Sequence, residues 1–244
     1  MKDIEIELFD RIVKKAEKVF LNSKTTYSYN EIINGCHVSN HSGSYKTMYA
    51  VGSNTWRGFH KKETTSAIGS KFVFTGYFTK NKDYIIENLK NMDNINKLNE
   101  FENKLCKNLK ELLISHIKEN MLNSFNKIRK PVDLYIEHIV SMSEELKDYK
   151  TKLIPMLFLP LDSQVFASEH IFTIKELYKY GLKRSSSFKD ITSPKSYSEL
   201  QRLLRIKAIK AGSILNKNFC RIYFDLLWNN RYENPGSSLF ETNF

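Results

Sequence analysis

Cysteine is scarce in this chain of 244 residues: there are three, Cys36, Cys106 and Cys220, odd in number and far apart in the sequence. They offer neither a disulfide framework nor a Cys-x-x-Cys metal site. Long apolar runs are missing as well, and the acidic first residues lack the apolar core of a secretion signal. We therefore expect a cytoplasmic protein that does not enter a membrane.

Proline and glycine, which interrupt regular structure, are few and unevenly placed. The segment 23–79 holds six of the nine glycines and none of the five prolines. Short strand-forming runs at 45–51 and 71–78 alternate there with Ser, Asn and Gly turns. Apolar residues recur at helical spacing in 6–21 and in 83–121, with an asparagine-rich break at 91–96. The sequence predicts a mainly α-helical protein with an irregular, possibly β-containing insert near the N-terminus.

Acidic side chains are outnumbered by basic ones. The chain has 27 Asp and Glu against 38 Lys and Arg, a formal net charge of +11. Such a balance favours a polyanionic partner, with nucleic acid as the first choice. The alternative is a basic composition whose charges are simply solvated at the surface.

Helix ends are well marked in the last third of the chain. Thr173-x-x-Glu176 and Ser196-x-x-Glu199 are capping boxes, and we expect glycine stops at Gly181 and near Gly212. A last helix is predicted at 219–228. The loop between the two capped helices is basic and rich in hydroxyls, which suits contacts to phosphate. Its candidate DNA-binding residues are Lys183, Arg184 and Ser186.

Two patterns with possible metal chemistry have weaker support. His37, His41 and His60 lie among Ser, Asn and Gly, where no carboxylate or cysteine completes a ligand shell, so we interpret them as loop histidines. Glu102-Asn103-Lys104 matches half of a nuclease site, but a solvated helix face is the simpler interpretation. The sequence thus predicts no metal site and no cofactor.

Trp56 stands in a cluster that could meet a nucleic acid. Arg57, Phe59, Lys61 and Lys62 follow closely, so a ring could stack on a base beside cations that hold phosphate. The alternative is that Trp56 is an ordinary hydrophobic anchor for its loop.

The segment from Lys130 to Phe166 combines a lysine and an aspartate at expected helix starts. Pro131 is suited to the first position of a helix, with Lys130 just outside it. A lysine there faces the positive end of the helix dipole, which favours the neutral, nucleophilic amine. Asp162 follows Pro160 and is a preferred N-cap for the short segment after it.

These residues carry a resemblance to a known family. The run from Asn126 to Asp133 resembles the hairpin and second helix of the helix-hairpin-helix DNA glycosylases with lyase activity, whose pattern is Gly-x-Gly-x-Lys-Val-Ala-Asp. The segment 159–162 resembles the one that carries their catalytic aspartate. The long connection between them and the run 224–228 are similar to the archaeal 8-oxoguanine glycosylase branch. The resemblance covers about residues 105–232, with Asn126 and Ile128 in place of the glycines and Phe224 in place of an acidic residue.

The resemblance implies a helix-hairpin-helix catalytic region at 105–244, preceded by a part at 1–104. Lys130 would attack the sugar of a flipped nucleotide, and Asp162 would hold the developing charge or move protons. Trp228 and Phe224 would contact the extruded base, with Lys127 and Arg129 contacting DNA nearby. The implied partner is double-stranded DNA with a damaged base, such as 8-oxoguanine, and the implied protein is a monomeric base-excision repair enzyme at the nucleoid.

Two other classes of function stay open. A sequence-specific endonuclease of the restriction type would need Mg²⁺ and would leave a 5′-phosphate without a sugar remnant. A noncatalytic DNA-binding protein would show salt-sensitive binding and no product.

Overall fold

The computed structural model describes residues 3–22, 26–39 and 45–227. In this part the chain is mainly helical, with one small antiparallel sheet, as expected. Its first elements are helix α1 (Asp3–Ala16), which continues as the π-helical turn η1 (Glu17–Leu21), and helix α2 (Tyr29–Asn34). Strands β1 (Cys36–Ser39) and β2 (Tyr45–Met48) follow and pair from Cys36↔Met48 to Ser39↔Tyr45.

Helices make up the rest of the described chain. They are α3 (Ser53–Trp56), α4 (Ser70–Lys80), α5 (Lys82–Lys90), α6 (Ile95–Ile114), α7 (Phe125–Met142), α8 (Lys150–Leu153), α9 (Ser163–Ala167), α10 (Ile174–Tyr178) and α11 (Pro194–Leu215). Short 3-10 turns lie between them: η2 (Glu119–Leu122), η3 (Glu144–Tyr149), η4 (Ile154–Met156), η5 (Phe188–Asp190) and η6 (Arg221–Leu227).

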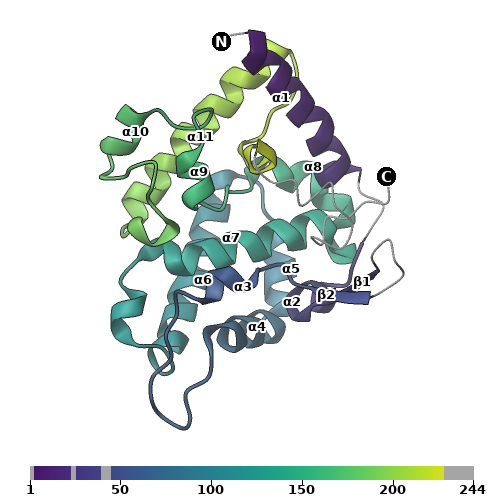
Figure 1. Cartoon of the computed structure of the whole chain (residues 1–244). Helices are drawn as coiled ribbons and strands as arrows, with labels where there is room; N and C mark the ends of the chain where they lie inside the picture. The colour runs from purple at the N-terminus through teal and green to yellow at the C-terminus, as the bar shows by residue number, and fades with distance from the viewer. Residues whose placement is uncertain (1–2, 23–25, 40–44, 228–244) are drawn as a thin grey trace.

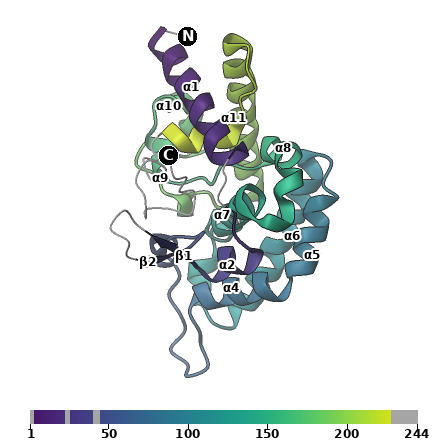
Figure 2. The same cartoon turned by 90° about the vertical axis from the view of Figure 1, so that its right-hand side faces the viewer.

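Helix α7 is the centre of the molecule. Nearly all of its residues are buried, and it packs against α2, α6, α11 and the turns η3 and η5. Both views place it between a part formed by α2 to α6 and a part formed by α1, α9, α10 and α11 (Figure 1 and Figure 2). A helix covered on all sides can present functional side chains only where its neighbours leave a gap.

The start of α7 corrects two expectations. The helix begins at Phe125 with Ser124 at the N-cap position, so Pro131 lies inside it rather than at its first position. The segment 126–129, expected to form a hairpin, is helical. Pro131 has no N–H, so the carbonyl of Lys127 lacks its intrahelical donor. We infer that packing on every side of α7 stabilises the helix enough for it to continue through Pro131.

The expected insert is only partly extended. The run 45–51 does contain a strand, β2, whereas the run 71–78 is part of helix α4. Val73, Phe74, Tyr77 and Phe78 are buried at helical spacing on one side of α4. Packing of that side against α2 and α6 outweighs the strand preference of aromatic and β-branched residues.

The boundary proposed at residues 104 and 105 lies within α6, which runs through it without a break. The buried residues of α6 join one hydrophobic core that includes residues of both expected parts. The boundary therefore does not coincide with an interruption of the helical structure. Among the described residues, no helix is long and apolar enough to cross a membrane.

The predicted caps are confirmed at α10 and shifted at α11. Thr173 and Glu176 form the capping box of α10, and Gly181 follows with a positive φ of 70°. Helix α11 starts earlier than expected, with Ser193 as its N-cap. It also passes through Gly212, where a Cβ atom would lie 2.7 Å from the carbonyl oxygen of Lys217. That glycine permits close approach of the following chain and does not end the helix.

Candidate active site

Lys130 and Asp162 meet in the structure. The Lys130 Nζ donates a hydrogen bond to Asp162 Oδ2 at 3.1 Å, although the two residues are 32 positions apart. Their side chains are 12% and 26% exposed, respectively. The pair is thus sheltered by the fold and still open to solvent, as a pair that handles a substrate must be.

Asp162 is held by the start of α9. It is the N-cap of that helix, as predicted, and its Oδ1 accepts from the backbone N–H of Gln164 at 2.9 Å and of Val165 at 3.3 Å. Its Oδ2 faces Lys130. One oxygen therefore fixes the carboxylate in place, and the other is directed at the amine.

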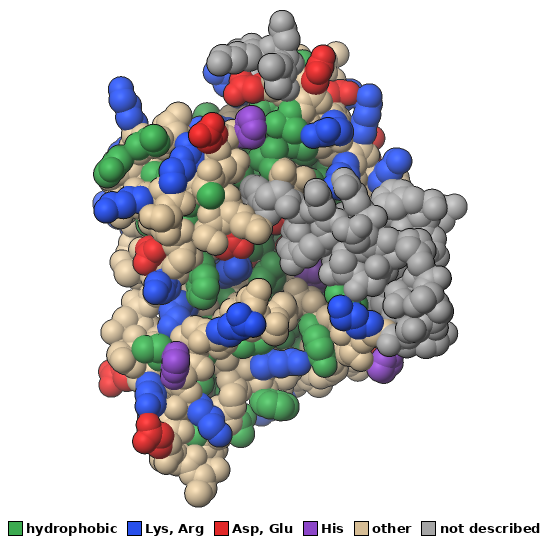
Figure 3. Space-filling view, viewed as in Figure 1, with side chains coloured by type: hydrophobic (Ala, Val, Ile, Leu, Met, Phe, Trp, Pro, Cys, Tyr) green, Lys and Arg blue, Asp and Glu red, His purple; other side chains and the backbone are tan. Residues whose placement is uncertain are grey.

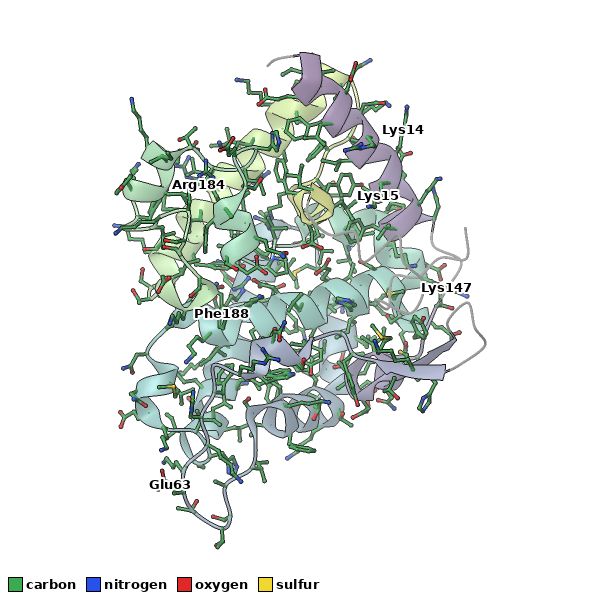
Figure 4. The ribbon with its side chains drawn as sticks, viewed as in Figure 1. Lys14, Lys15, Glu63, Lys147, Arg184 and Phe188 are labelled. Carbon is green, nitrogen blue, oxygen red and sulfur yellow. The ribbon has the colours of Figure 1, made fainter. Side chains whose placement is uncertain are left out.

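Phe188 forms a further wall of the site, which the sequence did not indicate. It is the first residue of η5, and its ring centroid lies 5.1 Å from Lys130 Nζ. Figure 4 shows Phe188 beside the N-terminal end of α7. A cation over an aromatic face is attracted by the ring, so Phe188 helps to hold the Lys130 amine.

Lys127 lies one turn before Lys130 and is more deeply buried, with 7% of the residue exposed. Its Nζ lies 3.8 Å from Met121 Sδ and 5.4 Å from the ring centroid of Phe59. Burial lowers the pKa of Lys127, and the positive charge of Lys189 lowers it further. The amine whose neutral form the structure favours in this way is Lys127.

The positive end of the α7 dipole acts on Lys127 and not on Lys130. Lys130 is beyond the first turn of α7, and the dipole effect falls off within one turn. Lys127 occupies the first turn instead. Deprotonation of Lys130 therefore has to come from its partner Asp162, since the Phe188 ring favours the charged form of the amine.

Arg129 is not placed to meet DNA, contrary to expectation. It is fully buried, where its guanidinium forms ion pairs with Glu102 and with Asp133, the latter at 2.6 Å. Asn103 accepts a further hydrogen bond from it at 2.7 Å. Glu102 is accordingly buried as well, which corrects its interpretation as part of a solvated helix face.

The aromatic candidates for base binding also need correction. Phe224 is 1% exposed and packs against Phe9 and Phe219, so it cannot touch a base in this conformation. Trp56 is half-buried, with its ring centroid 5.2 Å from that of Phe74, which favours the interpretation as a hydrophobic anchor. Trp228 lies outside the described residues.

Two of the three residues expected to bind DNA in the basic loop use their side chains for hydrogen bonds within the protein. Arg184 Nη1 donates to the carbonyl oxygens of Phe166 at 3.0 Å and Ser168 at 2.5 Å, at the end of α9. Ser186 Oγ accepts from the N–H of Lys183 at 2.9 Å. Lys183 and Lys189 are exposed and keep their side chains available to an anion.

No metal site is formed by the part of the chain that the structure describes: no three His, Cys, Asp or Glu side chains gather there to hold an ion. His37 lies on β1 with its Nδ1 3.3 Å from Thr47 Oγ1, and His60 is exposed. His41 lies outside the described residues. Figure 3 shows Lys and Arg side chains spread over this face of the molecule.

Comparison with protein-family models, with curated proteins and with solved structures finds no match for this chain. The resemblance described above therefore rests on residues of the chain itself, above all on Lys130 and Asp162.

Proposed function

We propose that the protein is a DNA N-glycosylase with AP-lyase activity that removes an oxidised purine, such as 8-oxoguanine, from double-stranded DNA. The observation that carries the proposal is the contact of 3.1 Å between Lys130 Nζ and Asp162 Oδ2 at a partly open site. An amine and a carboxylate in contact can act together as nucleophile and proton acceptor.

Lys130 performs the covalent step. Its neutral amine forms a bond to the anomeric carbon of the damaged nucleotide, the glycosidic bond breaks, and the base leaves with the bonding electron pair. The proton that the attached amine loses goes to Asp162 and from there to the departing base. The sugar ring then opens, its oxygen takes a proton from water, and an iminium forms between Lys130 and the sugar. Loss of a proton from the next sugar carbon then expels the 3′ phosphate and cuts the strand.

Asp162 assists the covalent step as a proton acceptor and as a negative charge. Its Oδ2 lies near enough to accept the proton that Lys130 must lose, and its negative charge stabilises positive charge that develops on the sugar. Because Oδ1 is held by two backbone N–H groups, the carboxylate does not have to be reoriented during the reaction.

The net charge of +11 supports a nucleic acid as the partner. Lys189 directly follows Phe188 within η5, and Lys183 lies five positions before Phe188. Both are exposed and suit phosphate contacts. The target nucleotide must leave the base stack, which costs least for a damaged or mismatched base.

Borohydride trapping tests the proposal. The protein is incubated in EDTA with a duplex that carries 8-oxoguanine, borohydride is added, and covalent protein–DNA adducts are counted on a denaturing gel. We expect an adduct with the natural protein and with Lys107→Ala, an exposed lysine of α6, and none with Lys130→Ala. An adduct that survives Lys130→Ala contradicts the assignment of the nucleophile.

The other outcomes separate the remaining classes of function. Cleavage that requires Mg²⁺ and leaves a 5′-phosphate without an adduct would identify an endonuclease. Salt-sensitive binding with neither adduct nor cleavage would identify a noncatalytic DNA-binding protein, which the net charge alone would also suit.

A further inference from the structure

Asn126 connects the segments that surround Lys130. It lies in the first turn of α7 and is fully buried. Its Nδ2 donates one hydrogen bond to the carbonyl oxygen of Leu161 at 3.0 Å and another to that of Phe188 at 3.1 Å. Leu161 directly precedes Asp162, so a single amide links α7 to both neighbours of the Lys130 amine.

The pattern of its hydrogen bonds indicates why an asparagine stands here. Both donors of the amide are used, whereas its Oδ1 is buried without a partner among the described residues. An unpaired buried acceptor is unfavourable, so packing alone does not account for the residue. The NH₂ group, with two donors in one plane, is the feature that its neighbours require.

A second amide holds the same segment further upstream. Gln201 of α11 donates to the carbonyl oxygen of Leu159 at 2.7 Å and accepts from its N–H at 3.3 Å. The chain that leads into Asp162 is therefore fixed to α11 at Leu159 and to α7 at Leu161. The attachment of Leu161 to Asn126 sets the position of Asp162 relative to Lys130, because both Lys130 and Asn126 belong to α7.

We propose that Asn126 is a positioning residue, which sets the separation of Lys130 and Asp162 and the place of the Phe188 ring beside them. It acts through these residues and does not touch the substrate. The proposal rests on the proposed function for its effect on rate, but not for its effect on the Lys130 amine.

The first test compares Asn126→Ala with Ser124→Ala as a matched control. Ser124 is buried at the same end of α7 and donates to the carbonyl oxygen of Ile191 at 3.0 Å, not to Leu161 or Phe188. Single-turnover rates of adduct formation on an abasic-site duplex are measured from pH 5 to 9, together with DNA affinity and the urea midpoint.

Asn126→Ala should slow adduct formation by about 10-fold or more, because small displacements of reacting groups have large effects on rate. The pH of half-maximal rate should shift, while DNA affinity stays within about 3-fold, since few phosphate contacts change. Ser124→Ala should change the rate by less than about 2-fold at a comparable loss of stability. Equal slowing in both variants, or none in either, overturns the proposal.

The second test does not require any activity. Trace acetylation with acetic anhydride, read by mass spectrometry, reports how freely each lysine amine reacts. In Asn126→Ala the labelling of Lys130 should rise several-fold relative to exposed Lys107, because the amine is released from Asp162. In Ser124→Ala it should stay unchanged.

The two tests fail in different ways. If the natural protein forms no adduct but Asn126→Ala still alters Lys130 labelling, the proposed function is wrong and the positioning role stands. If the natural protein forms an adduct and Asn126→Ala changes neither rate nor labelling, the positioning role is wrong and the proposed function stands.

Discussion

Two consecutive residues of α7 form cation–carboxylate pairs with opposite character. Arg129 points into the core, where it is paired with Glu102 and Asp133 and no part of the ion pairs is more than 1% exposed. Lys130 is partly open to solvent and pairs with the carboxylate of Asp162, at 12% and 26% exposure of the two side chains. A pair that is enclosed in the core stabilises one structure, whereas a pair that is partly open can exchange its partner for a substrate.

The core network also explains why its members are not available for chemistry. The guanidinium of Arg129 lies 4.7 Å from the ring centroids of both Phe158 and Tyr197, and Tyr197 donates to Asp133 at 2.7 Å. Burial raises the pKa of Glu102 to about 8, although Arg129 acts in the opposite direction. The network joins α6, α7 and α11, and so it fixes the part of α7 that carries Lys130.

The largest effect on stability is expected when the core pair, which is Arg129 with Glu102 and Asp133, is broken. Arg129→Met leaves Glu102 and Asp133 buried without their cation and should lower the free energy of unfolding by about 3–5 kcal/mol. Lys130→Met should lower it by less than about 1 kcal/mol, as for other partly exposed pairs. Urea unfolding of the two variants measures both. Similar losses would show that the two pairs do not differ in the way we describe.

The opposite pattern is expected for activity. Asp162→Asn keeps a good N-cap for α9 but removes the negative charge beside Lys130. The rate of adduct formation should fall by about 10²-fold, within the range for loss of a proton-transfer group. The urea midpoint should hardly move. A normal rate in this variant would show that the carboxylate has no part in the reaction.

The sequence predicts the local caps near the site, but it does not predict which side chains the fold buries. The cap at Asp162 and the capping box at Thr173 depend on residues within one turn, so local patterns predicted them. The burial of Glu102 depends on Arg129, 27 positions away, and nothing in the helical spacing of α6 indicates that partner. Phe188 was missed for the same reason, since its loop looks like a solvated basic segment until α7 packs beside it.

The start of α7 shows how a strong local pattern can mislead. Proline after a lysine is typical of a helix start, yet the helix begins at Phe125, six residues earlier in the chain than Pro131. Tertiary packing carries the helix across the proline. As a consequence, Asn126 and Lys127 face the site from the first turn of α7, where the sequence predicted a hairpin.

The pH dependence of stability should come from the core pair. The buried carboxyls of Glu102 and Asp133 share Arg129 as their cation, and burial raises the pKa of both. The folded chain therefore keeps a proton that the unfolded chain has released, so unfolding frees a proton between about pH 5 and 8. The free energy of unfolding should therefore fall as the pH rises through this range, by at most about 1.4 kcal/mol per pH unit. Glu102→Gln should flatten the slope, and Glu63→Gln, an exposed control, should not.

The smallest expected effect is at Lys127. Lys127→Met removes a buried ammonium whose pKa is lowered mainly by burial, and should raise the free energy of unfolding at pH 7 by about 1 kcal/mol. With a lowered pKa, natural Lys127 gives up its proton more readily in the folded chain, so stability of the natural protein gains as the pH rises toward 10. The advantage of Lys127→Met should shrink over that range. A constant advantage would mean that the ammonium is not strained by burial.

Mapping the residue that carries the trapped sugar tests the role of Lys130 directly. After borohydride reduction on an abasic-site duplex and digestion, mass spectrometry locates the adduct in the peptide around α7. We predict that the sugar is attached to Lys130, the partly exposed member of the two cations of α7. A sugar on Lys127 alone, or no covalent product at all from a correctly folded protein, would contradict it.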